Sequence, residues 1–279
     1  MSVKEPGQAL KTGVACAPFR AHLAAEHSDN NPKPPTSWVQ VEDEFLRAMA
    51  LFDTEVMASR ASEGERQNGK GDYFNDLIAL LLQNSSGQQL STRRGVSGLI
   101  FPNHNLDVTY PNSGIAEVLV EAKMLGTPKH SGSDKAGPKG RPAQADLLKR
   151  AKELGFKVID LKAGFGKVMQ ESGNRDQAGP AGDLETWSHA SKPRTFFLMA
   201  VRVVGEADYR SVIETAGNLK KILDGVGLYA YTNDHLDQPP SHYVQAKYRT
   251  TPLPPGMDLK DVMYQISSIL KGFGSAASH

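Results

Sequence analysis

The sequence predicts an α/β protein in which a central mixed sheet is flanked by helices. Three observations support this fold class. Stripes of apolar residues at helical spacing alternate along the chain with short apolar runs of strand length. Residues 104–126 alternate polar and apolar positions around a turn, which indicates a β-hairpin. Residues 156–163 and 194–204 are apolar enough to be buried strands, so the predicted order is helix, strand, hairpin, helix, strand.

Composition places the chain among ordinary globular proteins, with 39% hydrophobic and 23% charged residues in 279. The net charge of +1 argues against a sequence-blind nucleic-acid binder, although a nuclease needs only a locally basic cleft. Cys16 is the single cysteine, which excludes a disulfide framework and a cysteine-based zinc site within one chain. We expect a cytoplasmic protein with no membrane partner, because no signal peptide is recognisable and the apolar runs are short.

An arm and two helices are expected before the sheet. Residues 1–36 lack periodicity, and a proline-rich stretch there predicts a linker or extended arm. A first helix opens at Ser37, which forms a capping box with Gln40, and runs to about residue 59. A loop over 60–70 follows, and Asp72 caps a second helix. The apolar stripes of the two helices are expected to be buried: Trp38, Val41, Phe45, Ala48 and Phe52, then Phe74, Leu77, Ile78 and Leu81.

The sheet is predicted to begin with residues 95–101 and to continue directly into the hairpin. The hairpin turn is Pro-Asn-Ser-Gly at 111–114, a cluster that breaks periodic structure. On its first strand Asp107 lies on one face, and Leu106 and Val108 share the other. On its second strand Glu121 and Lys123 share a face. If the apolar faces are aligned, Asp107 therefore emerges beside Glu121 and Lys123.

Two carboxylates and an ammonium at one place suit metal-assisted hydrolysis of a phosphodiester. The carboxylates repel each other unless a hard cation lies between them, and Mg²⁺ needs only one or two protein carboxylates besides water and phosphate. Such a metal polarises the phosphodiester and lowers the pKa of a bound water. A neighbouring lysine steadies the attacking hydroxide or the developing charge on phosphorus.

Asp107, followed after thirteen residues by Glu121-Ala122-Lys123, resembles the signature of PD-(D/E)XK nucleases. The proline that often precedes the first aspartate is absent, and Leu106 stands there. The nearest likeness within this superfamily is to type II restriction endonucleases, over roughly residues 70–204. The resemblance implies a restriction-endonuclease-like core that cuts double-stranded DNA as a homodimer. It also implies that Asp107 and Glu121 bind Mg²⁺ and that Lys123 orients the water.

Two other triplets of the D/E-x-K form occur, at 160–162 and 258–260. The first falls in the predicted strand 156–163, but the preceding segment 142–155 is predicted to be a helix that ends at Gly155. The second opens a helical pattern and is expected on a helix surface. Only the triplet at 121–123 has an acid on an adjacent predicted strand.

Further site residues are expected around this centre. Many nucleases of the superfamily carry an acid on the helix before the first strand, and Asp76 or Asp72 would be its counterpart. The alternative is a helix cap plus a solvated aspartate. The loop 127–141 is basic and is expected to grip phosphates, the alternative being a solvated mobile loop. The predicted DNA-binding residues are Arg93, Arg94, Lys129, His130, Lys135, Lys139 and Arg141.

Three regions are expected: an N-terminal arm and helical region at 1–70, a catalytic core at 71–204, and a helical and loop region at 205–279 for DNA recognition or dimerisation. The last region contains helical patterns at 207–227 and 259–271. Two other functions remain open alongside restriction. One is a repair or recombination nuclease of the same superfamily, and the other is a non-catalytic DNA-binding or assembly protein.

Overall fold

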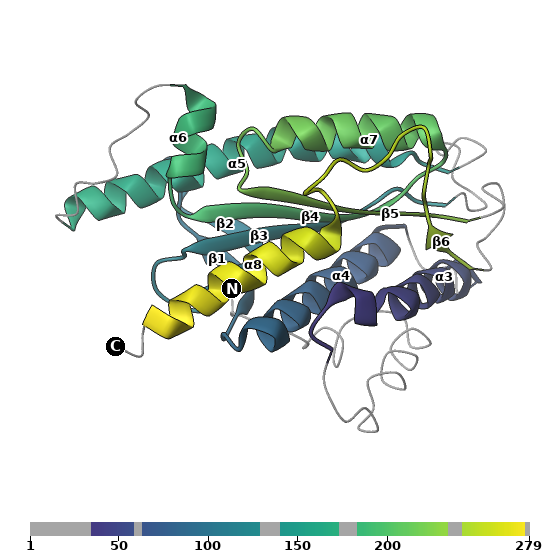
Figure 1. The fold of residues 1–279 in the computed structure, drawn as a ribbon, viewed down its shortest axis with the longest axis horizontal. Helices are drawn as coiled ribbons and strands as arrows, with labels where there is room; N and C mark the ends of the chain where they lie inside the picture. Colours follow the sequence, from purple (N-terminus) through teal and green to yellow (C-terminus); the bar gives the residue numbers. More distant parts are fainter. Residues whose placement is uncertain (1–34, 59–62, 129–139, 173–182, 234–241, 277–279) are drawn as a thin grey trace.

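A six-stranded mixed sheet in the order β1-β2-β3-β4-β5-β6 forms the centre of the fold (Figure 1). The computed structural model describes residues 35–58, 63–128, 140–172, 183–233 and 242–276. An antiparallel meander comes first, followed by two parallel pairings and one antiparallel edge strand. The predicted α/β class with a mixed sheet is confirmed. The strands are β1 (Ser91–Val96), β2 (His104–Tyr110), β3 (Val118–Leu125), β4 (Arg194–Arg202), β5 (Gly225–Thr232) and β6 (Val244–Gln245).

Helices cover both faces of the sheet (Figure 1). On one face lie α5 (Ala143–Glu171) and α7 (Glu206–Leu219), with the short α6 (Leu184–Ala190) near one end of α5. On the other face lie α4 (Glu63–Ser86) and α8 (Leu259–Ala276), with α3 (Glu42–Ala58) beside α4. Side chains alternate along buried β4, so Phe196 and Leu198 join one core while Phe197 and Met199 join the other.

For the helices before the sheet, the sequence predicts the buried residues correctly but places the helix boundaries wrongly. The nine apolar residues predicted to face inward are all buried. A 3₁₀ turn, η1 (Trp38–Gln40), precedes α3, and the Ser37 N–H donates to Gln40 Oε1 at 3.1 Å as in a capping box. The loop predicted over 60–70 and the N-cap at Asp72 are wrong, because α4 begins at Glu63. Lys70 of α4 pairs with Asp53 of α3, so a buried ion pair holds the first half of α4 against α3.

The first strand lies earlier in the chain than the predicted strand at 95–101, which is wrong. β1 spans Ser91–Val96, and the apolar residues that follow it form a loop in which Leu99, Ile100 and Phe101 are exposed. A hydrogen bond of 2.5 Å between Ser91 Oγ and Thr109 Oγ1 of β2 supports the pairing. Polar cross-strand contacts therefore define β1 more than apolar content does.

One long helix replaces the predicted helix at 142–155 and strand at 156–163. α5 has 29 residues, and its buried side chains keep helical spacing through Leu147, Leu154, Val158 and Leu161. Gly155 does not end the helix: α5 continues past it, and a Cβ there would make only an ordinary contact with Ile222 at 3.5 Å. The consequence is that residues 156–163 belong to a helix that crosses the sheet beside the hairpin.

The C-terminal elements differ from prediction mainly in their limits. The helix predicted at 207–227 is α7, which ends at Leu219, and β5 begins at Gly225. A Cβ at Gly225 would lie 2.9 Å from Phe196, so the close approach of β4 and β5 requires glycine there. The final helix is confirmed and extends to Ala276. None of the helices in the described ranges is long and apolar enough to cross a membrane.

The division into regions at residues 70 and 204 stays a prediction. α4 runs continuously through position 70, and β5 pairs with β4 in the same sheet although it follows position 204. Contacts between the proposed regions are therefore extensive.

Candidate active site

Asp107, Glu121 and Lys123 meet where β2 and β3 stop pairing. The ladder between these strands ends at the pair Val108–Val120. One step further, Asp107 Oδ2 accepts the backbone N–H of Ala122 at 2.9 Å, so a side chain replaces a strand carbonyl as acceptor. The predicted sharing of a face by Leu106 and Val108 is wrong, because the two residues belong to different buried clusters. The two strands therefore separate at the point where the carboxylate enters.

The three charged side chains form one ionic cluster, as predicted, although β2 departs from the regular alternation on which that prediction was based. Lys123 Nζ lies 2.6 Å from Asp107 Oδ2 and 3.0 Å from Glu121 Oε1. The side chains are 26%, 15% and 10% exposed respectively, so solvent reaches the lysine more readily than the acids. A single ammonium thus holds both carboxylates at one place, and their catalytic role stays a prediction.

Burial and mutual repulsion shape the protonation of the cluster. Burial raises the pKa of Asp107 above its ordinary value, the Glu121 carboxylate raises it further, and Lys123 offsets part of this. For Lys123, burial alone would lower the pKa, but the attraction of Asp107 and Glu121 outweighs burial and raises it. The lysine is therefore a cationic donor at neutral pH.

Two polar residues complete the cluster, and the sequence analysis missed both. Asn75 of α4 donates its Nδ2–H to Asp107 Oδ1 at 2.9 Å. Lys157 of α5 lies with its Nζ 3.0 Å from Glu121 Oε1 and donates to the Asn105 carbonyl at 3.1 Å. Asn75 was missed because only acids were sought on that helix. Lys157 was missed because its segment was assigned to a strand, whereas helical spacing would have aligned it with the basic residues seven positions earlier.

Two oxygen atoms of the cluster are buried without a hydrogen-bond partner among the described residues: Glu121 Oε2 and Asn75 Oδ1. Buried polar atoms are normally paired, because leaving one unpaired costs free energy. Both atoms are hard oxygen donors of the kind that Mg²⁺ binds. In the described ranges no group of three or more His, Cys, Asp or Glu side chains could hold a metal. The donor set of two carboxylates and one amide fits an ion that keeps several of its waters.

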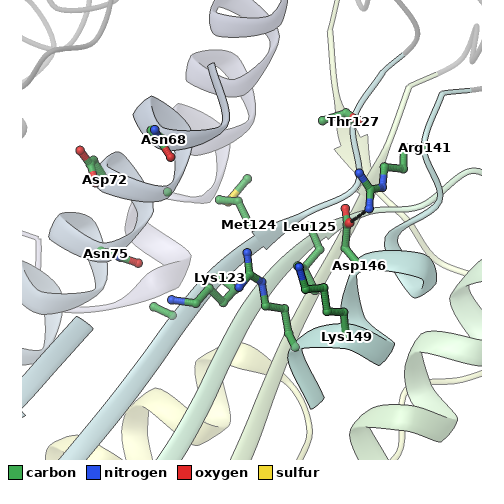
Figure 2. Close-up of a pocket in the computed structure, with 13 residues that line it drawn as sticks. Asn68, Asp72, Asn75, Lys123, Met124, Leu125, Thr127, Arg141, Asp146 and Lys149 are labelled. Carbon is green, nitrogen blue, oxygen red and sulfur yellow. Dashed lines mark ion pairs between the residues drawn. The ribbon is translucent and has the colours of Figure 1, made fainter. Parts of the chain in front are cut away.

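A cleft of about 470 Å³ opens beside the cluster (Figure 2). It lies between α4 and the start of α5, with the end of β3 between them. Its lining is mainly polar and includes Asn68, Asp72, Asn75, Lys123, Thr127, Arg141, Asp146, Lys149 and Arg150. A space of this size with cations from β3 and α5 can receive a phosphate-bearing chain.

The candidate auxiliary acids have different surroundings. Asp72 is partly exposed on the wall of the cleft and pairs with Arg93 of β1. Asp76 is 4% exposed, so the alternative of a solvated aspartate is wrong for this residue. Neither observation assigns a metal-binding role, which stays a prediction for both.

The predicted DNA-binding residues also differ in their surroundings. Arg94 donates to the carbonyls of Pro111 and Gly114, so its guanidinium holds the hairpin turn. Burial lowers the pKa of Arg94 from its ordinary value. Arg141 lines the cleft and pairs with Asp146 at 2.6 Å (Figure 2). The residues Lys129, His130, Lys135 and Lys139 lie outside the described part of the chain.

Comparisons with protein-family models, with curated proteins and with solved structures find no match for this chain. The geometry and chemistry of the cluster and its cleft are therefore the observations that bear on function. Membership of the PD-(D/E)XK nucleases stays a prediction from the sequence motif.

Proposed function

We propose that the protein is a Mg²⁺-dependent endonuclease that hydrolyses double-stranded DNA in the manner of type II restriction enzymes. One observation carries the proposal: Asp107, Glu121 and Lys123 converge from two strands beside a polar cleft. Burying charged groups costs folding free energy. Clusters of buried acids and a lysine therefore occur preferentially at functional sites. The unpartnered oxygens of Glu121 and Asn75 add ligands of the right chemistry.

The surrounding elements support the same proposal. A helix, an antiparallel meander, a helix and a parallel strand occur in this order as α4, β1–β3, α5 and β4, with the short α6 between the last two. This order is consistent with the core that the resemblance to PD-(D/E)XK nucleases implies. The acids come from the second and third strands of the meander, where that signature would put them.

Each residue has a distinct role in the proposal. Asp107 and Glu121 would hold the ion, and Mg²⁺ bound there would supply Lewis acidity toward a phosphodiester and toward water. Lys123 keeps its proton at neutral pH and donates hydrogen bonds to the attacking water or to a phosphoryl oxygen. Lys157 fixes the Glu121 carboxylate from the opposite helix. Asn75 fixes the Asp107 carboxylate in the same way.

The cleft supplies the contacts that position DNA. Lys149, Arg150 and Arg141 line its α5 side, and exposed cations of this kind pair with backbone phosphates. They would fix the register of a duplex without reading its sequence. Their local concentration explains how a chain of nearly zero net charge can bind a polyanion.

The test is digestion of plasmid and phage DNA with and without Mg²⁺, followed by gel electrophoresis. We expect cutting only with Mg²⁺, and we expect Glu121→Gln to lower the rate about 1,000-fold. Glu117→Gln is the matched control, because Glu117 pairs with Lys192 at 3.0 Å and lies apart from the cluster. The protein with Gln at position 117 should cut normally.

Four results of this test are informative. Discrete bands would support restriction, and a smear would support a repair or recombination nuclease of the same chemistry. Intact DNA in Mg²⁺, or full cutting by the Glu121→Gln protein, would refute the proposed site.

A further inference from the structure

The loop between β1 and β2 holds three consecutive apolar side chains in solvent. Leu99 is 50% exposed, Ile100 is 66% exposed and Phe101 is 49% exposed. Phe156 of α5 is also exposed and meets Phe101 edge to face, with ring centroids 5.5 Å apart. Contiguous exposed apolar side chains are unusual unless they meet a partner. We name these four residues the apolar loop cluster.

The loop is held in this shape by a buried carboxylate. Asp160 of α5, only 2% exposed, accepts the backbone N–H groups of Ile100 at 2.7 Å and Phe101 at 3.1 Å. It also contacts His104 Nε2 at 2.7 Å, and its own carbonyl accepts the N–H of Leu99 at 3.1 Å. The backbone of all three exposed apolar residues is therefore bound to one turn of α5.

Two glycines allow the loop to lie directly on the helix. A Cβ at Gly164 of α5 would lie 2.6 Å from the carbonyl carbon of Gly98, which no side chain tolerates. A Cβ at Gly98 would collide with the Asp160 carboxylate. Backbone against backbone leaves the apolar side chains no space beneath the loop, so they project outward. The exposure of the cluster is built into the fold and is not a result of loose packing.

The apolar loop cluster lies beside the proposed active site. The loop ends at His104, and the next residue, Asn105, accepts a hydrogen bond from Lys157, which also contacts Glu121. On α5, Phe156 is seven residues after Lys149, so the two share a face about two turns apart. The basic side of the cleft therefore leads along α5 to the apolar cluster.

We propose that Leu99, Ile100 and Phe101 form a wedge that enters a groove of the duplex held in the cleft. This inference rests on the proposed function. Apolar side chains inserted at a base step unstack it and bend the duplex, which then contacts more of the protein. The cleft that adjoins the cluster is lined by Lys123, Arg141, Lys149 and Arg150, and this set of cations favours a polyanionic occupant.

The test measures DNA binding and bending without cutting, in the Glu121→Gln background with Ca²⁺. The probe is a set of end-labelled phage DNA fragments, with affinity from gel shift and bending from energy transfer between the ends. We expect the double change Leu99→Ser and Ile100→Ser to weaken binding about tenfold and to abolish bending. Val39→Ser is the matched control, because Val39 is 65% exposed on η1 and should leave both unchanged.

The outcomes separate the wedge from the nuclease. Unaltered binding and bending by the double variant would overturn the wedge, while Mg²⁺-dependent cutting by the unmodified protein would leave the proposed function standing. Failure of every form to bind DNA would overturn both. Conversion of a dimer to a monomer by the double variant, seen by sedimentation, would identify a self-association surface and overturn the wedge.

Discussion

Two triplets of the same form, one in a strand and one in a helix, give opposite results in this molecule. In β3, the side chains of Glu121 and Lys123 emerge on one side of the strand, and Lys123 Nζ lies 3.0 Å from Glu121 Oε1. In α5, Asp160 and Lys162 are also two residues apart, but helical geometry turns them away from each other. Asp160 reaches the loop before β2, and Lys162 Nζ lies 3.1 Å from Asp224.

The two lysines differ in how their charges are satisfied. Lys162 donates to the carbonyls of Ser191 and Pro193 as well as to Asp224, and burial lowers its pKa more than the aspartate raises it. The pKa of Lys123 is raised because two carboxylates outweigh its burial. The helix lysine thus has three acceptors, whereas in the strand cluster Glu121 Oε2 has no hydrogen-bond partner within the described part of the chain. Of these two triplets, only the one in a strand brings its acid and its lysine together.

The third triplet shows a further use of the same residues. Asp258 precedes α8 and accepts the Lys260 backbone N–H at 3.0 Å, while the two side chains form an exposed pair at 3.5 Å. This agrees with the prediction of a helix surface. Its role is to cap a helix start.

The largest expected effect is on activity, and it separates the half-buried Lys123 from the buried Lys162. Lys123→Met should lower the rate of Mg²⁺-dependent DNA cutting by about 100- to 1,000-fold, because the donor to water or phosphate is lost. Lys162→Met should leave the rate per folded molecule unchanged. Initial rates on plasmid, scaled to the folded fraction from circular dichroism, measure the difference. Equal rates for the two variants would contradict the claim that Lys123, and not Lys162, takes part in cutting.

The next effect reverses the order of the two lysines. Lys162→Met should reduce the free energy of unfolding by roughly 3 kcal/mol, because two buried carbonyls and a carboxylate lose a donor. Lys123→Met should cost less, because Asp107 keeps Asn75 and Glu121 keeps Lys157. Urea unfolding gives both values. A smaller loss for Lys162→Met than for Lys123→Met would show that this account of the helix lysine is wrong.

A pH-dependent effect follows for Asp160. Burial would raise its pKa, but hydrogen bonds from His104, Ile100 and Phe101 outweigh burial and lower it below 3.8. Its stabilising contribution is therefore complete above that value and is lost as the pH falls through the lowered pKa. Asp160→Asn should cost about 2 kcal/mol at neutral pH, and this difference should shrink in acid. Urea unfolding between about pH 3 and 5, below the titration of histidine, tests the trend. A constant difference would contradict it.

The smallest effect belongs to the exposed triplet. Lys260→Ala should change the free energy of unfolding by less than about 0.5 kcal/mol, because an exposed ion pair contributes little in water. The same urea titration measures it. A loss comparable to that of Lys162→Met would mean that solvent exposure does not determine how much these ion pairs contribute to stability.

The sequence predicted the hairpin and its three charged residues well, because strand alternation and a Pro-Asn-Ser-Gly turn are local signals. It failed where a glycine inside a helix resembled a helix end. Gly155 looked like a helix end, yet the helix continues past it and carries Lys157 and Asp160. Asn75 could not be found from its own neighbourhood, since its partner Asp107 lies thirty-two residues away. The missing parts of the site are those contributed across long sequence separations.

The hydrogen bond from the Ala122 backbone to Asp107 links a peptide group of the central sheet to the charge of one side chain. Amides further back in β3 exchange their protons with solvent only when the strands open. The Ala122 amide becomes accessible whenever the carboxylate is neutralised or drawn toward another ligand. We therefore expect the exchange rate of the Ala122 amide, measured by nuclear magnetic resonance, to report whether a ligand is bound at the Asp107 carboxylate.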